Sequence, residues 1–150
     1  MSLPTTILPE HHRLCDDLFV AAEEAVQRGD WAAAAPAYAR LDAQMQAHFE
    51  AEESVLFPAF EDATGMSGGP TEMMRYEHEQ MRGLLAQMQE ACAARDADAY
   101  GGAAETLLML MQQHNMKEEN ILYPMCDQAL GAEAESLGAK MSATLELGDA

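Results

Sequence analysis

Residues 41–58, LDAQMQAHFEAEESVLFP, and residues 107–124, LLMLMQQHNMKEENILYP, decide the fold of this chain. The two stretches align without a gap at an offset of 114 − 48 = 66 positions. An offset that carries apolar residues onto apolar residues, and polar ones onto polar ones, indicates an internal structural repeat. The matched pairs are Leu41 and Leu107, Met45 and Met111, His48 and His114, Glu52 and Glu118, and Val55-Leu56-Phe57-Pro58 and Ile121-Leu122-Tyr123-Pro124.

The repeat extends to the residues that precede each of these stretches. The same offset carries residues 8–19 onto residues 74–85, and histidine again falls on histidine. His11 has no histidine counterpart, and we expect it at the surface. The further matched pairs are Leu8 and Met74, His12 and His78, Cys15 and Met81, and Phe19 and Leu85.

The spacing of the matched residues within each stretch is that of a helix. Positions 41, 45, 48, 52 and 55 step by four, three, four and three, so their side chains lie along one face of a helix. That face is apolar except for one histidine and one glutamate, which stand one turn apart. The repeat at 107–124 has the same pattern, and the segments around His12 and His78 each have an apolar face that contains one histidine.

Turn signals divide the chain into four long helices. We expect them at about 9–28, 30–62, 70–95 and 96–129, with Gly29, the glycines of residues 65–69 and Gly131 between or after them. Alanine, leucine, methionine, glutamate and glutamine dominate the composition, and these residues favour helix. The sequence therefore predicts an all-α fold.

Short connections make each helix run back beside the one before it, which gives an up-down-up-down four-helix bundle with an internal two-helix repeat. We expect residues 1–130 to form this bundle. Residues 131–150 are a C-terminal extension that forms either a short helix or a disordered segment.

Charge and composition exclude several partners. The formal net charge of −18, from 26 acidic and 8 basic residues, repels nucleic acid and anionic lipid. The first residues lack a signal-peptide pattern and no run is long enough to cross a bilayer, so we expect a soluble cytoplasmic protein that binds neither nucleic acid nor membrane. Three unpaired cysteines without close spacing are expected to be reduced and mostly buried.

The apolar faces of the four predicted helices aim charged groups at the bundle axis. A lone His-x-x-x-Glu on a helix is usually an exposed ion pair, but here two copies share one offset and both lie on an apolar face. Buried carboxylates without compensation are costly, so positive ions should be present between them. The predicted metal ligands are His12, His48, Glu52, His78, His114 and Glu118.

Nitrogen and carboxylate ligands favour a redox-active pair of ions, either two irons or iron with manganese. Two histidines per ion and two bridging glutamates give each ion four protein contacts. An oxo or hydroxo bridge adds a fifth and leaves one position open for a small molecule. Zinc normally prefers a closed site with four ligands.

Neighbouring residues are given lesser roles. Glu50, Glu53 and Glu119 lie off the apolar faces, and we expect them in solvent or in contact with the ligands rather than on the metal. Most of the 12 methionines should fill gaps in the core. Cys15 and Met81 are each near a predicted ligand and are candidates for lining the pocket.

The order of a lone histidine and then His-x-x-x-Glu, repeated once, resembles the hemerythrin-like family of His-His-Glu cation-binding domains, over about residues 9–130. The resemblance implies a non-haem di-iron centre that reacts with dioxygen or nitric oxide. Oxygen-carrying hemerythrins have a fifth histidine one turn from the third-helix ligand, where this chain has Met74 and Arg82. They also have an aspartate five residues after the last histidine, whereas Glu118 follows His114 by four. The six-ligand set looks more like the bacterial di-iron type.

Three functions are compatible with the sequence. The leading one is binding of a diatomic ligand, O2 or NO, for sensing, storage or stress response, because no separate nucleophile is recognisable. The second is an enzyme, namely a peroxidase, ferroxidase or nitric oxide reductase, in which Cys15, Tyr76 or Tyr123 donates a proton. The third is donation of iron to damaged iron centres. A metal-free structural bundle is the alternative to all three.

Overall fold

The computed structural model describes residues 3–149, and its described part is all helical, as the sequence predicts. No β-strand occurs within this range. The helices, with π-helical and 3-10 segments labelled η, are α1 (Pro4–Gln27), α2 (Trp31–Ala51), η1 (Glu52–Leu56), α3 (Phe57–Thr64), α4 (Pro70–Ala93), α5 (Ala97–Lys117), η2 (Glu118–Leu122), α6 (Tyr123–Leu130), η3 (Gly131–Glu133) and α7 (Ala134–Asp149).

The sequence repeat is also a repeat of structure. Every element from α1 to α3 has a partner from α4 to α6 that begins and ends 66 positions later, so Pro4–Gln27 corresponds to Pro70–Ala93 and Trp31–Ala51 to Ala97–Lys117. The first helix starts at Pro4 rather than at about residue 9 as predicted, because Pro9 is accommodated inside it. Buried Leu8, just before Pro9, packs in the core and holds the first turn in place.

A π-helical turn follows each long helix that carries a His-Glu pair. The prolines at 58 and 124 have no N–H to donate to the carbonyl four residues earlier, and their rings would clash with it. The chain widens at this point, and the N–H of Phe57 bonds to the carbonyl of Glu52, five residues back. Tyr123 and Glu118 repeat this bond. Such turns often occur at functional sites, and here both begin at a predicted ligand.

The tight turns between paired helices are built alike in both halves. Asp30 and Asp96 cap the helices that follow, each accepting a hydrogen bond from a backbone N–H three residues on. The residue before each cap has positive φ: Gly29 at 70° and Arg95 at 54°. Glycine adopts this left-handed conformation freely, whereas arginine is strained in it.

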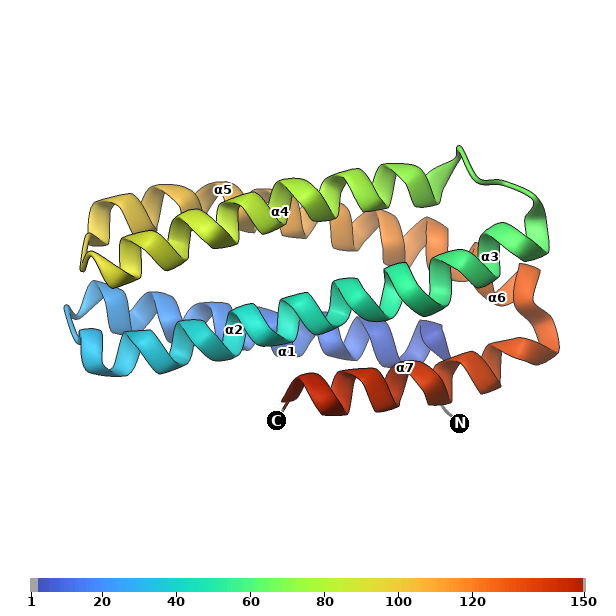
Figure 1. The fold of residues 1–150 in the computed structure, drawn as a ribbon, viewed down its shortest axis with the longest axis horizontal. Helices are drawn as coiled ribbons and strands as arrows, with labels where there is room; N and C mark the ends of the chain where they lie inside the picture. The colour runs from blue at the N-terminus through green and yellow to red at the C-terminus, as the bar shows by residue number, and fades with distance from the viewer. Residues whose placement is uncertain (1–2, 150) are drawn as a thin grey trace.

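The four long helices lie side by side as an antiparallel bundle, and α7 runs back along it (Figure 1). Helix α1 packs on α2, α4 packs on α5, and the two pairs meet through α2 with α4 and α1 with α5. Helix α7 packs mainly on α2 and α1 and buries Met141 and Leu145. The chain therefore adds a fifth long helix to one side of the bundle.

Two apolar clusters fill the interior. One lies toward the tight turns and includes Phe19, Leu85 and Leu107, and the other lies toward η1 and η2 and includes Leu56, Phe60 and Met141. Buried histidines and glutamates occupy the layer between them. The polar layer is thus closed off at both ends by hydrocarbon.

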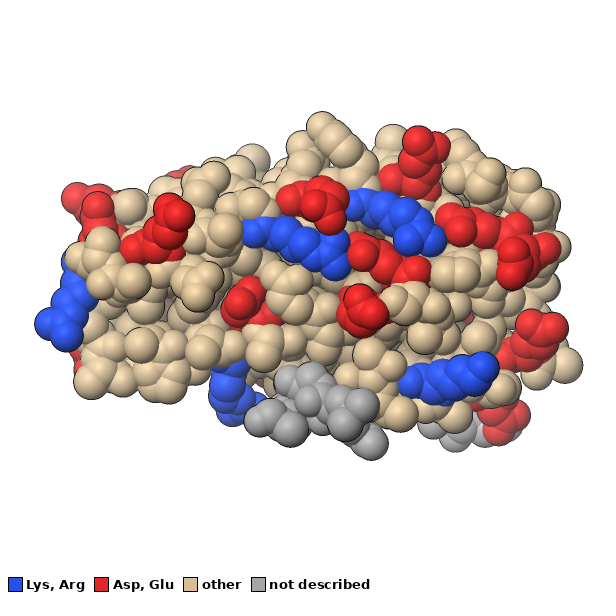
Figure 2. Space-filling model, viewed as in Figure 1, with Lys and Arg blue, Asp and Glu red and all other residues tan. Residues whose placement is uncertain are grey.

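On the outside, basic and acidic side chains alternate over the junction of α2 and α4 (Figure 2). Arg82 pairs with Glu53 and Glu79, and Arg75 pairs with Glu61. No helix among the described residues has the length and apolar character needed to cross a bilayer.

Candidate metal centre

The six predicted ligands come together in the buried polar layer. His12 lies on α1, His48 at the end of α2, His78 on α4 and His114 near the end of α5, while Glu52 and Glu118 begin the two π-helical turns. None of the six is more than 5% exposed, and both glutamates are fully buried. Each side chain comes from a different element, so folding alone assembles the cluster.

The six side chains form two four-residue clusters that share both glutamates. We call the cluster of His12, His48, Glu52 and Glu118 position A, and the cluster of His78, His114 and the same two glutamates position B. Within each cluster, the ligand atoms lie within 4.8 Å of one another. Each position thus offers two nitrogens and two oxygens at a spacing that suits one metal ion.

Each of the two glutamates points one carboxylate oxygen toward position A and the other toward position B. Glu52 Oε1 lies 2.9 Å from His78 Nε2 at position B, and Glu52 Oε2 lies 3.4 Å from His48 Nε2 at position A. Glu118 places Oε1 3.1 Å from His12 Nε2 and Oε2 3.2 Å from His114 Nε2. All four histidines therefore present Nε2 to the cluster.

Buried polar atoms without a hydrogen bond indicate whether a cation fits between the histidines and glutamates. At position B, all four inward atoms, namely Glu52 Oε1, His78 Nε2, His114 Nε2 and Glu118 Oε2, are buried without a hydrogen bond, although the ion-pair distances are short. Buried polar groups are normally paired, and an orphan costs about 1–3 kcal/mol. A metal ion would contact all four atoms at once, so the residues of position B fit a metal ion.

At position A, a tyrosine takes part instead. The Oη of Tyr123 lies 2.6 Å from Glu52 Oε2 and 2.8 Å from Glu118 Oε1, and its proton is shared between them. The same oxygen lies 3.3 Å from His12 Nε2 and 3.4 Å from His48 Nε2. Burial, followed by the two carboxylates, raises the pKa of Tyr123 well above its usual value, so the phenol keeps its proton.

Carboxylates hold the outer nitrogens of three of the four histidines. The Nδ1 of His12 donates to Glu119 at 2.7 Å, and the Nδ1 of His78 donates to Glu53 at 2.6 Å. The Nδ1 of His114 donates to Glu77 at 2.7 Å. Such partners fix the tautomer and orientation of a metal-binding imidazole and raise its basicity.

The fourth outer nitrogen, Nδ1 of His48, is held by His11. The two Nδ1 atoms are 2.8 Å apart, and His11 Nε2 lies 2.7 Å from the side-chain carbonyl of Gln44. The expectation that His11 lies at the surface is wrong, because it is only 7% exposed. His11 has no histidine counterpart in the repeat, which predicted the surface, but it is buried on the side of α1 that faces α2 and contacts His48 there.

Basic residues steady two of the three supporting carboxylates. Glu53 is paired with Arg82 and Glu77 with Lys117. Burial works against ionisation of Glu53, but hydrogen bonds from His78 and Arg82 outweigh it and lower the pKa of Glu53 to about 2. The side chain of Glu119 is 35% exposed, and no lysine or arginine is paired with it among the described residues.

The glutamates also control the protons on the imidazoles. Burial alone would lower the pKa of His48, but Glu52 and Glu118 outweigh it and raise this pKa to about 10. Glu118, followed by Glu52, likewise overcomes burial and raises the pKa of His114 to about 9. Without a metal these imidazoles are protonated at neutral pH, so they hold positive charge in the place where a cation would sit.

A small cavity of about 20 Å³ adjoins the cluster on the side away from Tyr123. Its non-ligand lining is Cys15, Met45, Phe49, Met81, Met111 and Asn115. A polar surface groove of about 320 Å³ reaches His12 and Glu119 from outside and shares His12 and Asn115 with the cavity. Together the groove and the cavity mark an approach to position A.

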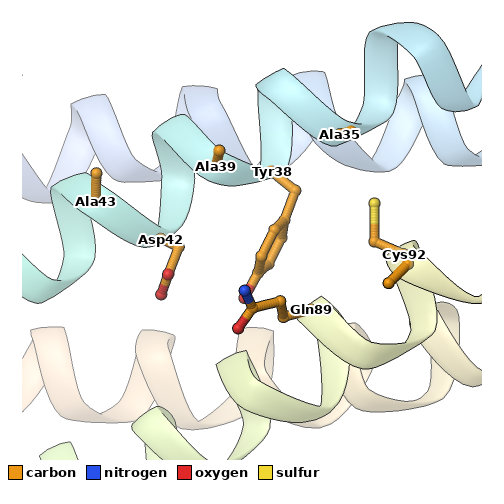
Figure 3. A pocket seen from close by; sticks show the side chains of 8 residues that line it. Ala35, Tyr38, Ala39, Asp42, Ala43, Gln89 and Cys92 are labelled. Atoms are coloured by element: carbon orange, nitrogen blue, oxygen red, sulfur yellow. The ribbon is translucent and has the colours of Figure 1, made fainter.

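A second groove, between α2 and α4, contains no comparable cluster (Figure 3). It measures about 320 Å³ and is lined by four alanines together with Tyr38, Asp42, Gln89 and Cys92. Its single carboxylate and single thiol do not form a metal site. The three cysteines of the chain are all buried and unpaired.

Three residues contact the cluster in ways that the sequence did not predict, namely His11, Glu77 and Tyr123. The sequence offers Tyr123 as a candidate proton donor, although its position in the repeat, matching Phe57, also places it directly after η2. No role was predicted for Glu77, although it precedes His78 as His11 precedes His12. Comparing the residues next to each repeated histidine would have found both His11 and Glu77.

Residues 3–126 match the family model of the hemerythrin HHE cation binding domain. No curated protein and no solved structure matches the chain. The family match and the two His/Glu clusters agree in describing a metal-binding protein.

Proposed function

We propose that this chain, which belongs to the hemerythrin HHE cation-binding family, holds two iron ions, at positions A and B, and binds O2 or NO beside them. Iron with manganese is the alternative pair. The six residues predicted from the sequence would be the ligands. An iron pair of this kind supplies electrons to a small diatomic molecule, and the protein determines access, polarity and proton supply.

The cavity beside the cluster is the observation that carries this proposal. At about 20 Å³ it has room for one very small molecule, and its walls are largely methionine and phenylalanine side chains. Larger substrates are excluded by size. A ligand of two atoms can fit with little adjustment of the methionine side chains, which adapt easily.

Proton supply on this side is poor, which favours binding over turnover. Cys15 is the thiol in the cavity wall, and burial, with a smaller effect of Asp16, raises its pKa to about 12. The hydroxyl of Tyr123 does not line the cavity and is engaged with the two bridging glutamates. Among the side chains of the cavity wall other than the proposed ligands, the one thiol is therefore a poor proton donor.

Filling the cavity tests the proposal. The Met111→Phe variant should slow or abolish the NO adduct seen in stopped-flow spectra of the reduced, iron-loaded protein while its iron content is retained. Met88→Phe is the matched control, because Met88 is fully buried in the same apolar cluster but does not line the cavity. A wild-type protein that forms no adduct with O2 or NO would refute the proposal.

An enzymatic role is the second candidate, and the surface groove favours it. The groove reaches His12, and the partly exposed Glu119 connects the Nδ1 of His12 to solvent. This arrangement gives protons and water a route toward position A, which a peroxidase, ferroxidase or nitric oxide reductase requires. Turnover of peroxide, ferrous iron or NO that falls in Glu119→Gln at unchanged iron content would support it, and absence of any turnover would exclude it.

A further inference from the structure

The two halves of the bundle share one repeat but do not treat the two metal positions alike. At the offset of 66, Tyr123 stands where the other half has Phe57, and His11 stands where the other half has Glu77. Both differences fall at position A.

The first difference is a hydroxyl group. Tyr123 Oη contacts the oxygens of Glu52 and Glu118 that face position A, so those oxygens are already partnered in the metal-free chain. Phe57 has no such group, and the four inward atoms of position B have no hydrogen bond. A cation entering position B gains four contacts and displaces no hydroxyl group, whereas one entering position A must displace the hydroxyl of Tyr123 from both glutamates.

The second difference is the partner of an imidazole. If a metal occupies Nε2 of His48, the ring proton is on Nδ1 and is donated to Nδ1 of His11. His11 can accept it, because its own proton is on Nε2, which faces the carbonyl of Gln44. His48 is therefore supported by a neutral ring, whereas Glu53 and Glu77 support both imidazoles of position B.

Glu119 offsets part of this difference in favour of position A, because it accepts a hydrogen bond from His12. No lysine or arginine among the described residues is paired with Glu119, so its negative charge is not neutralised by an ion pair of that kind. Position A still has one supporting carboxylate against two at position B. The displaced hydroxyl adds to this difference. Both observations thus point the same way.

We propose that position B takes up the first metal ion and holds it more tightly, and that position A takes up the second and releases it first. The inference rests on the proposed two-metal site and adds an order to it. Changing a partner of a metal-bound histidine typically alters affinity by about 10-fold to 100-fold. The two binding steps should therefore be separated by about 10-fold or more.

Calorimetric titration of the metal-free chain with cobalt(II), free of other metals, tests the order. We expect two resolved steps of one ion each. The ultraviolet difference spectrum of Tyr123, identified by its loss in Tyr123→Phe, should change only with the second ion. Two ions that bind in one step, or a Tyr123 signal that changes with the first ion, would overturn the inference and leave the two-metal site intact.

Variants that exchange the differing residues give a matched set. Tyr123→Phe and His11→Glu should each strengthen the weaker step, by about 10-fold or more, and leave the tighter step unchanged. The mirror variants Phe57→Tyr and Glu77→His should weaken the tighter step instead. The opposite pattern would overturn the order, and binding of fewer than two ions by the wild-type chain would refute the proposed function itself.

Discussion

Removing the metal from the loaded protein should lower its free energy of unfolding by about 4 kcal/mol, since four buried atoms at position B lose their partner and each orphan costs at least about 1 kcal/mol. The lower end of that cost is appropriate because Glu52 Oε1 and Glu118 Oε2 keep short ion-pair contacts with His78 and His114 at 2.9 and 3.2 Å. For a chain of 150 residues, a loss of about 4 kcal/mol corresponds to a fall in Tm of about 8–16 °C.

Thermal unfolding followed by circular dichroism, at a fixed free metal concentration, measures this difference. The comparison needs metal-free and metal-loaded samples of the same preparation. His114→Gln removes a proposed ligand of position B and should shrink the metal-dependent shift in Tm. Coincident unfolding curves with and without metal would refute the reasoning, because a cation that satisfies buried orphans must add its binding free energy to folding.

Three further outcomes follow from the same geometry. Metal uptake should release protons and strengthen as the pH rises toward 9 or 10, because metal displaces protons from His48 and His114, and calorimetry can follow this proton release. In the metal-free chain, the stabilisation that these protonated imidazoles give is complete below about pH 6.5. Denaturant titrations should show that it is lost as the pH rises through 9 to 10. Glu53→Gln should weaken metal binding by about 10-fold to 100-fold in a chelator competition, because Glu53 is the partner of the His78 Nδ1. Glu79 is mostly exposed and pairs with Arg82, as Glu53 does, so Glu79→Gln should leave metal binding nearly unchanged. Arg95→Gly should raise the free energy of unfolding by about 1 kcal/mol in urea titrations, because arginine is strained at a φ of 54° where the equivalent turn has glycine, and no gain would show that this strain is absent.

The repeat made the fold readable from the sequence. Helical spacing places a residue on a face, and an apolar face must be buried, so the bundle and the convergence of six side chains were both predictable. The π-helical turns at Glu52 and Glu118 were not predicted. One extra residue in a single turn hardly changes the helical periodicity of a sequence, so periodicity does not reveal a π-helical turn. Pro58 and Pro124 do indicate the missing backbone hydrogen bonds that cause these turns.

The partners of the six proposed ligands were harder to predict than the convergence of the six residues themselves. Glu53 and Glu119 were expected in solvent or near the ligands, and both contact an imidazole across the bundle. Each bond joins helices that the sequence does not place in register, so the contact depends on packing. His11 shows the same limit, because its burial depends on how α1 meets α2 rather than on any pattern within α1.

Metal analysis of the protein after anaerobic purification tests the central claim most directly. We expect about two iron ions per chain, or one iron and one manganese, and a loss of that content when either bridging glutamate, Glu52 or Glu118, is changed to alanine. A folded chain that contains no transition metal, or that retains its full metal content without these glutamates, would contradict the claim that they join two metal ions at the centre of the bundle.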